Sequence, residues 1–280
     1  MEKIFGLDYL TSKFDNYTLD TLPHSILIIG KEGSGKHVIS KYLSDKFNLN
    51  LLDISDDLSD ELIDNIYRDV SPRFYLVDLR KITEKEQNIL LKLFEEPSAN
   101  AYIILLANST FSVLPTILNR GQIFNINIYD KATLMEFAKE KDVKVDVKYF
   151  GNVVETPGDI KKLYSSNVSM DTITDLTDKI INKINIASYA NTLTIVNKLN
   201  FKDEYDKIDV DFFLKTLYYN SAEECIKGND KAYTIYSNVG ETLRKLTDTR
   251  LNKRILVTHM LSEIWLEAKR WNYASWKTKS

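Results

Sequence analysis

The sequence predicts an α/β fold in which a five-stranded parallel sheet is followed by a region that is almost entirely helical. Three observations indicate this. Short apolar runs alternate with amphipathic stretches up to about Asn127, the pattern of parallel strands joined by right-handed helical crossovers. A glycine-rich loop follows the first apolar run. After Tyr129 the strand pattern fades, and from Ser169 onward there are two glycines and no proline, which favours helices.

The first two strand–helix pairs follow from hydrophobic periodicity. Residues 25–30 contain four successive apolar residues, typical of a buried strand, and residues 37–47 carry apolar side chains at helical spacing. A second strand is expected at residues 49–54. The acidic helix after it, at residues 56–70, is expected to be capped by the Ser55–Asp56 region.

The remaining strands are expected at residues 73–79, 101–108 and 121–128. A helix at residues 84–96 separates the first two of these and ends before a proline, as helices tend to. Because the strands are almost wholly apolar, we expect helices on both faces of the sheet.

The helical region begins with predicted helices at residues 130–141 and 157–166, the second starting at a Pro-Gly break. The last helix carries an apolar stripe at helical spacing, made of Val257, Leu261, Ile264, Ala268 and Trp271. We interpret this stripe as the core of a bundle. The predicted domains are residues 1–129, 130–167 and 168–280.

Composition limits the class of protein. The chain has 280 residues, 44% of them hydrophobic, so it can bury a large core in roughly two or three domains. Its net charge is −3, so the chain as a whole does not attract nucleic acid, and any nucleic-acid partner would have to bind a local basic surface. The single cysteine excludes an internal disulfide framework and a cysteine-rich zinc module. Neither a signal peptide nor an apolar stretch of ~20 residues is recognisable, so we expect a cytoplasmic chain without a membrane partner.

Residues 28–37 nearly complete the phosphate-binding pattern G-x-x-x-x-G-K-[ST]. In such a loop the glycines let backbone N–H groups turn toward phosphates, and the lysine and the helix N-terminus add positive charge. The candidate residues for binding ATP or ADP are Gly30, Lys31, Glu32, Gly33, Ser34, Gly35, Lys36 and His37. A histidine occupies the position of the usual Mg²⁺-binding hydroxyl, and imidazole suits this hard cation poorly, so we expect weakly held Mg²⁺.

An acid at the end of the third strand would complete a catalytic site. Asp78 is placed to orient a Mg²⁺-bound water, but Leu79 follows where hydrolysing enzymes usually have a glutamate. Leucine cannot accept a proton, so the general-base position is empty and slow hydrolysis is expected. Glu84 and Glu86 are expected on the next helix, facing solvent.

Three segments together resemble the clamp-loader branch of the AAA+ ATPases, closest to the delta-prime and then the tau/gamma subunits of bacterial DNA polymerase III. They are residues 22–36, 74–79 and 88–124, the last containing "LLKLFEEP" and "LPTILNRGQ". The resemblance covers about residues 20–130 and is only architectural over the C-terminal helices. The zinc module of the bacterial subunits is missing, since no cysteine lies between Lys36 and Asp78.

The resemblance implies an AAA+ domain, a helical lid at 130–167 and an oligomerising collar at 168–280. It implies that Asn108 senses the terminal phosphate, and that Lys161 or Lys162 stands in for a second sensor. Arg120 matches an arginine that acts in trans on a neighbour's ATP, although Asn119 and Gly121 replace the flanking serine and cysteine. A plain ion pair is the alternative for Arg120.

The partners implied by the resemblance are other clamp-loader subunits, the sliding clamp and primed DNA. Lys81 and Lys85 match positions that grip primer–template. Residues 239–280 carry nine Lys/Arg against four Asp/Glu with interspersed aromatics, which favours a solvated helix face over a DNA surface. Three functions stay open: a clamp-loader subunit with degenerate hydrolysis motifs, an ATP-hydrolysing motor of a minimal clamp loader, and a non-replicative AAA+ adaptor.

Overall fold

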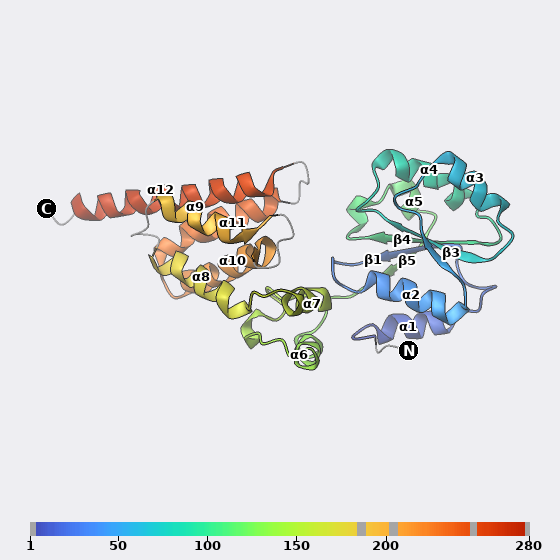
Figure 1. The fold of residues 1–280 in the computed structure, drawn as a ribbon, viewed down its shortest axis with the longest axis horizontal. Coiled ribbons are helices and arrows are strands. Elements are labelled where there is room, and N and C mark those ends of the chain that lie inside the picture. Colours follow the sequence, from blue (N-terminus) through green and yellow to red (C-terminus); the bar gives the residue numbers. More distant parts are fainter. Residues whose placement is uncertain (1–3, 184–188, 202–206, 247–250, 278–280) are drawn as a thin grey trace. The chain divides into compact units, whose positions relative to one another are not determined.

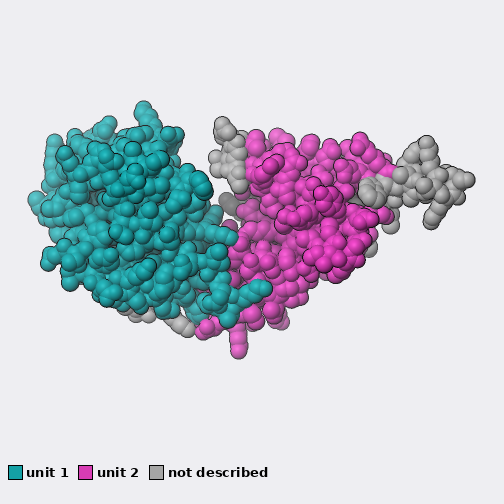
Figure 2. All heavy atoms as spheres, turned by 180° about the vertical axis from the view of Figure 1, so that it is seen from behind, with its two compact units in different colours: residues 1–133, 156–158 teal, residues 134–155, 159–280 magenta. Residues whose placement is uncertain are grey.

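The computed structural model describes residues 4–183, 189–201, 207–246 and 251–277. The chain forms two compact units, one made of residues 1–133 with 156–158 and the other of residues 134–155 with 159–280 (Figure 2). The first unit therefore takes in a short segment from later in the chain. The division into three domains stays a prediction.

The first unit is built on a five-stranded parallel sheet, so this part of the predicted fold class is confirmed. The strands are β1 (Ser25–Ile29), β2 (Leu51–Asp53), β3 (Arg73–Asp78), β4 (Ala101–Ala107) and β5 (Gln122–Asn125), in the order β2-β3-β4-β1-β5. Ile29 pairs with Ala107, and Asp78 pairs with Leu106. The carboxyl ends of β1, β3 and β4 consequently meet at one edge, where ligands bind in open parallel sheets.

Helices cover both faces of this sheet, as the apolar strands predict (Figure 1). One face carries α1 (Asp8–Asp15) and α2 (Lys36–Phe47), and the other carries α3 (Asp60–Arg68), α4 (Glu84–Glu95) and the short α5 (Pro115–Leu118). Leu27 and Ile29 of β1 pack in the core cluster with α3 and α4. On the opposite face the rings of Phe14 and Phe124 lie 4.4 Å apart.

The predicted cap of the acidic helix was wrong. α3 begins at Asp60, and the Ser59 side chain accepts a hydrogen bond from the Leu62 N–H. In the segment before the helix, Ile54 and Leu58 are buried in the core. Ser55 instead lies beneath the end of β3, where it accepts a hydrogen bond from the Asp78 N–H at 2.8 Å.

The rest of the described chain is mainly helical, as predicted. It comprises η1 (Thr110–Ser112), α6 (Lys131–Glu140), η2 (Val147–Tyr149), α7 (Pro157–Ser165), α8 (Met170–Lys183), α9 (Tyr189–Lys198), β6 (Leu199–Asn200), β7 (Ile208–Asp209), α10 (Val210–Ile226), α11 (Asp230–Lys245) and α12 (Lys253–Lys277). Helix α10 packs against α8 and α11, and α12 packs against α11 and α9.

The apolar stripe of α12 lies in the core of the second unit. Val257, Leu261, Ile264 and Ala268 are buried, which confirms their interpretation as bundle core. The side chain of Trp271 lies outside the described residues. Among the helices that the structure describes, none has the length and apolar character needed to cross a membrane.

Candidate functional site

The glycine-rich loop turns tightly between β1 and α2. Gly33 and Gly35 have φ angles of +74° and +96°, in the left-handed region that only glycine adopts readily. Space is also restricted, because a Cβ at Gly33 would lie 2.6 Å from the Thr156 Oγ1. The loop thus needs both glycines for its shape, and it leads directly into the N-terminus of α2.

A second segment holds this loop from outside. The Gly158 N–H donates to the Gly33 carbonyl at 2.9 Å, and a Cβ at Gly158 would lie 2.3 Å from the Gly33 Cα. From the other side the Tyr129 hydroxyl donates to the Ser34 carbonyl at 2.8 Å, and burial raises the pKa of this tyrosine. Sequence reasoning treated Pro157–Gly158 only as a helix break and missed this contact. The glycine itself was the available signal.

Lys36 is buried at the mouth of the loop, with 5% of its surface exposed. Its ammonium donates to the Gly30 carbonyl at 2.6 Å, the Lys31 carbonyl at 2.9 Å and the Asn108 Oδ1 at 2.9 Å. Burial, and then the charge of Arg80, lower the pKa of Lys36 from 10.5 to about 8. The structure therefore brings together the predicted lysine and the predicted sensor asparagine.

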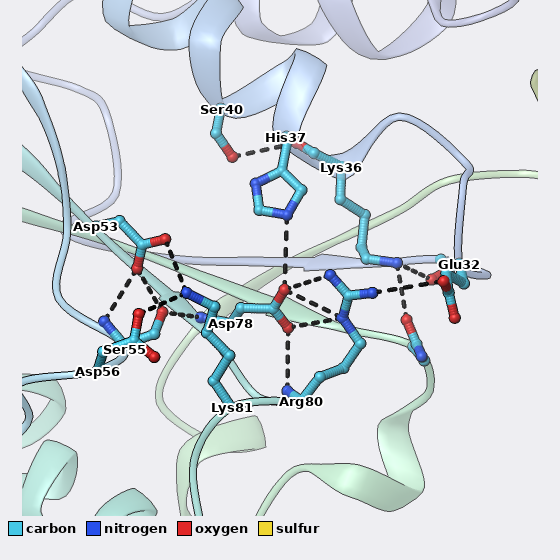
Figure 3. A network of polar contacts seen from close by, with 12 residues as sticks. Glu32, Lys36, His37, Ser40, Asp53, Ser55, Asp56, Asp78, Arg80 and Lys81 are labelled. Carbon is cyan, nitrogen blue, oxygen red and sulfur yellow. Dashed lines mark hydrogen bonds and ion pairs between the residues drawn. The ribbon is translucent and has the colours of Figure 1, made fainter. Parts of the chain in front are cut away.

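The Asp78 carboxylate is enclosed by Arg80 (Figure 3). The Arg80 Nη2 lies 2.6 Å from Oδ2, its Nε lies 3.1 Å from both carboxylate oxygens, and its backbone N–H donates to Oδ1 at 3.0 Å. Only 2% of the Asp78 side chain is exposed. Burial by itself raises the pKa of Asp78, but the hydrogen bonds and charge of Arg80 outweigh it and hold the pKa below its ordinary value.

His37 and Glu32 complete this cluster. The His37 Nε2 lies 3.5 Å from the Asp78 Oδ2, and the Glu32 Oε1 lies 3.8 Å from the Arg80 Nη1. Magnesium prefers oxygen ligands in an octahedral shell that keeps several waters. An imidazole and a carboxylate already bound by arginine do not fit that requirement. Within the described residues no group of three or more His, Cys, Asp or Glu side chains is arranged to hold a metal ion.

Side chains around the expected general-base position have structural roles. Leu79 is buried in the core cluster that includes Leu90 and Leu93 of α4. Glu86 does not simply face solvent as expected, because it forms a capping box with Thr83 at the start of α4. Glu84 is exposed in the first turn of that helix.

Arg120 lies just before β5, and 39% of its side chain is exposed. Its Nη2 is 3.0 Å from the Glu95 Oε1 at the end of α4, and its Nη1 donates to the Thr116 carbonyl at 3.0 Å. The next residue is closely packed, because a Cβ at Gly121 would lie 2.0 Å from the Leu27 Cδ1. The ion pair predicted as the alternative for Arg120 is thus present in the single chain.

The other candidates belong to other elements of the chain. Lys161 and Lys162 are exposed on α7, in the second unit. Lys81 pairs with Asp56 at 2.7 Å and Asp53 at 3.6 Å, whereas Lys85 is exposed on α4. In α12 the Lys269 ammonium lies 4.3 Å from the centroid of the Trp265 ring. Side chains from residue 271 onward lie outside the described residues.

Fold and site together define a class. A parallel sheet with a glycine-rich loop after β1, an acid ending β3 and an asparagine after β4 is an AAA+ type α/β domain, here followed by helices. Residues 53–130 match the family described as "DNA polymerase III, delta subunit". Over this segment the chain is similar to that family, and the resemblance read from the sequence is confirmed.

Two curated proteins are similar to parts of the chain. The DNA polymerase III subunit delta' of Haemophilus influenzae is 37% identical over 67 residues, which are 24% of this chain and 20% of that protein. The same subunit of Buchnera aphidicola is 28% identical over 95 residues, covering 34% of this chain and 26% of that protein. The matches thus span about a fifth to a quarter of the length of these relatives.

Solved structures of RuvB from Thermotoga maritima are similar in outline. The structure described as a Holliday junction branch migration motor has a TM-score of 0.43 and 15% identity, covering 76% of this chain and 69% of that chain. A variant of the same RuvB has a TM-score of 0.44 at 15% identity with the same coverage.

Proposed function

We propose that this chain is a delta-prime-type subunit of a clamp loader, which helps place a sliding clamp on primed DNA during replication. The observation that carries the proposal is the match over residues 53–130. That segment runs from β2 through β5 and contains Asp78, the Glu-Glu-Pro end of α4 and Arg120. The glycine-rich loop lies earlier in the chain, between β1 of the same sheet and α2.

The loop is proposed to bind ATP or ADP. Gly33 and Gly35 hold the backbone in the turn, the N-terminus of α2 follows, and the Lys36 ammonium lies at the loop mouth beside Asn108. Each of these features favours a phosphate group. A nucleotide would offer Lys36 anionic oxygens in place of the neutral carbonyl and amide acceptors that it now has.

Hydrolysis by the isolated chain is proposed to be slow. The residue after Asp78 is Leu79, which is part of the hydrophobic core and has no carboxylate to act as general base. A positioned general base contributes about 10²–10⁴-fold in rate. The chain would therefore act mainly as a structural and activating partner, with Arg120 directed at the nucleotide of an adjoining subunit.

The test is assembly with candidate partner subunits encoded beside this chain. Co-purification followed by mass measurement of the intact complex should give a defined assembly whose ATPase rises with clamp and primed DNA. The purified chain alone should turn over far more slowly than the assembly. Turnover near 1 per second by the isolated chain, lost in Lys36→Ala, would instead identify a motor subunit. Failure to form any assembly would remove the clamp-loader proposal.

A further inference from the structure

Arg80 occupies a central position that the proposed mechanism does not yet use. Its guanidinium binds Asp78 on one side and lies 3.8 Å from Glu32 of the phosphate-binding loop on the other. Figure 3 shows Glu32 and Lys36 on the side of the guanidinium that faces away from Asp78. The arginine thus lies between the acid at the end of β3 and the loop.

Exposure indicates which charge an incoming ligand meets. Asp78 is 2% exposed, whereas the Arg80 side chain is 42% exposed. An ion arriving from solvent therefore meets the guanidinium and not the carboxylate behind it. The charge of Arg80 also acts at the loop, because it is the second cause, after burial, of the lowered pKa of Lys36. The charges of Asp78 and Glu32 act on Lys36 in the opposite direction. Arg80 and Lys36 thus place two cationic groups beside the loop.

Guanidinium chemistry suits this position. Arginine presents five N–H donors in a rigid fork, is charged at all ordinary pH values and binds phosphate well. The Nε and Nη2 atoms are used on Asp78, while Nη1 is directed to Glu32 at a distance longer than a hydrogen bond. The Arg80 Nη1 can therefore exchange its long contact with Glu32 for a phosphate oxygen. The ion pair between Arg80 and Asp78 need not change.

We propose that Arg80 takes the place of the divalent cation, contacting the nucleotide phosphates itself, so that this site binds nucleotide without Mg²⁺. The inference rests on the proposed nucleotide binding. It explains two departures together: a histidine where a Mg²⁺-binding hydroxyl is usual, and an arginine on the carboxylate that would otherwise face the metal. The ligand class is a nucleoside di- or triphosphate carrying its full charge.

The first measurement is calorimetric titration of the full chain with ATP and ADP, in EDTA and in Mg²⁺. Wild type should bind with similar affinity in both. Arg80→Gln should bind about 10- to 100-fold more weakly in EDTA, the size of a lost hydrogen bond to a charged group. Mg²⁺ should restore part of this loss, because Asp78 is then open, and His37→Thr added to Arg80→Gln should increase the Mg²⁺ effect.

Removal of Arg80 also uncovers the Asp78 charge, which by itself repels phosphate. The double variant Asp78→Asn/Arg80→Gln separates the two effects because it removes both charges. It should still bind weakly in EDTA if Arg80 contacts the phosphates. Arg73→Gln is the matched control, since Arg73 pairs with Asp69 at the opposite end of β3. It should leave affinity unchanged, and thermal melting of every variant checks folding.

The outcomes are distinguishable. Wild-type binding that requires Mg²⁺ overturns the role of Arg80 and leaves nucleotide binding in place. Wild-type affinity of the double variant in EDTA shows that Arg80 only neutralises Asp78, which also overturns the proposal. No binding to wild type at millimolar nucleotide, with or without Mg²⁺, removes both this inference and the nucleotide part of the proposed function.

Discussion

At the scale of single residues, the cluster beside the glycine-rich loop contains two buried charged side chains, Lys36 and Asp78. Asp78 is in direct contact with the guanidinium of Arg80. Lys36 makes its three hydrogen bonds to uncharged acceptors. For this reason the pKa of Asp78 is lowered by its partner, whereas the pKa of Lys36 is lowered by burial.

The lowered pKa of Lys36 predicts how nucleotide affinity depends on pH. Free Lys36 loses its proton near pH 8, and a phosphate ligand favours the charged form. Binding above pH 8 must therefore take up a proton, and affinity should fall about fivefold between pH 8 and pH 9. Calorimetry in buffers of different ionisation enthalpy measures the uptake. Lys36→Arg stays charged, so its affinity should be flat over this range; an equally steep fall would assign the effect to another group.

The lowered pKa of Lys36 also predicts how the free energy of unfolding changes with pH. Between the folded pKa of about 8 and the unfolded value of 10.5, the unfolded chain binds more protons at Lys36 than the folded chain. The contribution of this lysine to the free energy of unfolding therefore rises with pH across that window and is least favourable below it. Comparison of wild type with Lys36→Met isolates this contribution from other titrating groups.

At the scale of elements, contacts between distant segments decide the shape of the site. The loop after β1 is held by residues 156–158, which the chain reaches only after the whole sheet and α6. Gly158→Ala would put a methyl group 2.3 Å from the Gly33 Cα, and two backbones cannot yield as a flexible side chain can.

Gly158→Ala should therefore weaken nucleotide binding at least tenfold and lower the melting temperature of the first unit. Overpacking of this kind is expected to destabilise by about 1–3 kcal/mol. Gly228→Ser provides a control for glycine replacement, because nothing lies within 4 Å of its added Cβ, although its φ of +86° adds local strain. That control should leave nucleotide affinity unchanged. Normal affinity in Gly158→Ala would show that residues 156–158 do not support the loop.

The capping box of α4 gives a second prediction at this scale. Thr83 accepts a hydrogen bond from the Glu86 N–H, and the Glu86 carboxylate accepts one from the Thr83 N–H at 2.6 Å. Thr83→Ala should lower the free energy of unfolding by about 1 kcal/mol. Chemical denaturation measures this, and Thr83→Ser, which keeps the hydroxyl, should recover most of the loss. No change in either variant would mean that solvent replaces the cap fully.

At the scale of the whole molecule, Arg120 distinguishes a role within the chain from a role in an assembly. Its ion pair with Glu95 is partly exposed, and such pairs contribute about 0–1 kcal/mol. Arg120→Ala should therefore leave folding and the chain's own nucleotide affinity nearly unchanged. The ATPase of the assembled complex should fall by about 10³–10⁵-fold where this arginine acts as a finger.

Glu95→Gln is the matched variant, because it releases Arg120 without removing it. Its assembled ATPase should equal or exceed the wild-type rate. Suppose that Arg120→Ala destabilises the fold, and that the ATPase rate of the assembly per folded subunit is unaltered. The ion pair within the chain is then the only role of this arginine. Thermal melting and the steady-state ATPase assay separate the two outcomes.

The sequence by itself determined the sheet, the loop and the class of protein. Apolar runs such as residues 101–108 and the spacing from Gly30 to Lys36 are local signals, and local backbone preferences act on neighbouring residues. The tertiary structure alone decided that Arg80 folds back on Asp78, that Gly158 packs on Gly33, and that α3 starts at Asp60 and not beside Ser55. These outcomes depend on which groups meet in space. Contacts between segments far apart in the chain, which hydrophobic periodicity does not encode, therefore decide which charged groups meet at the site.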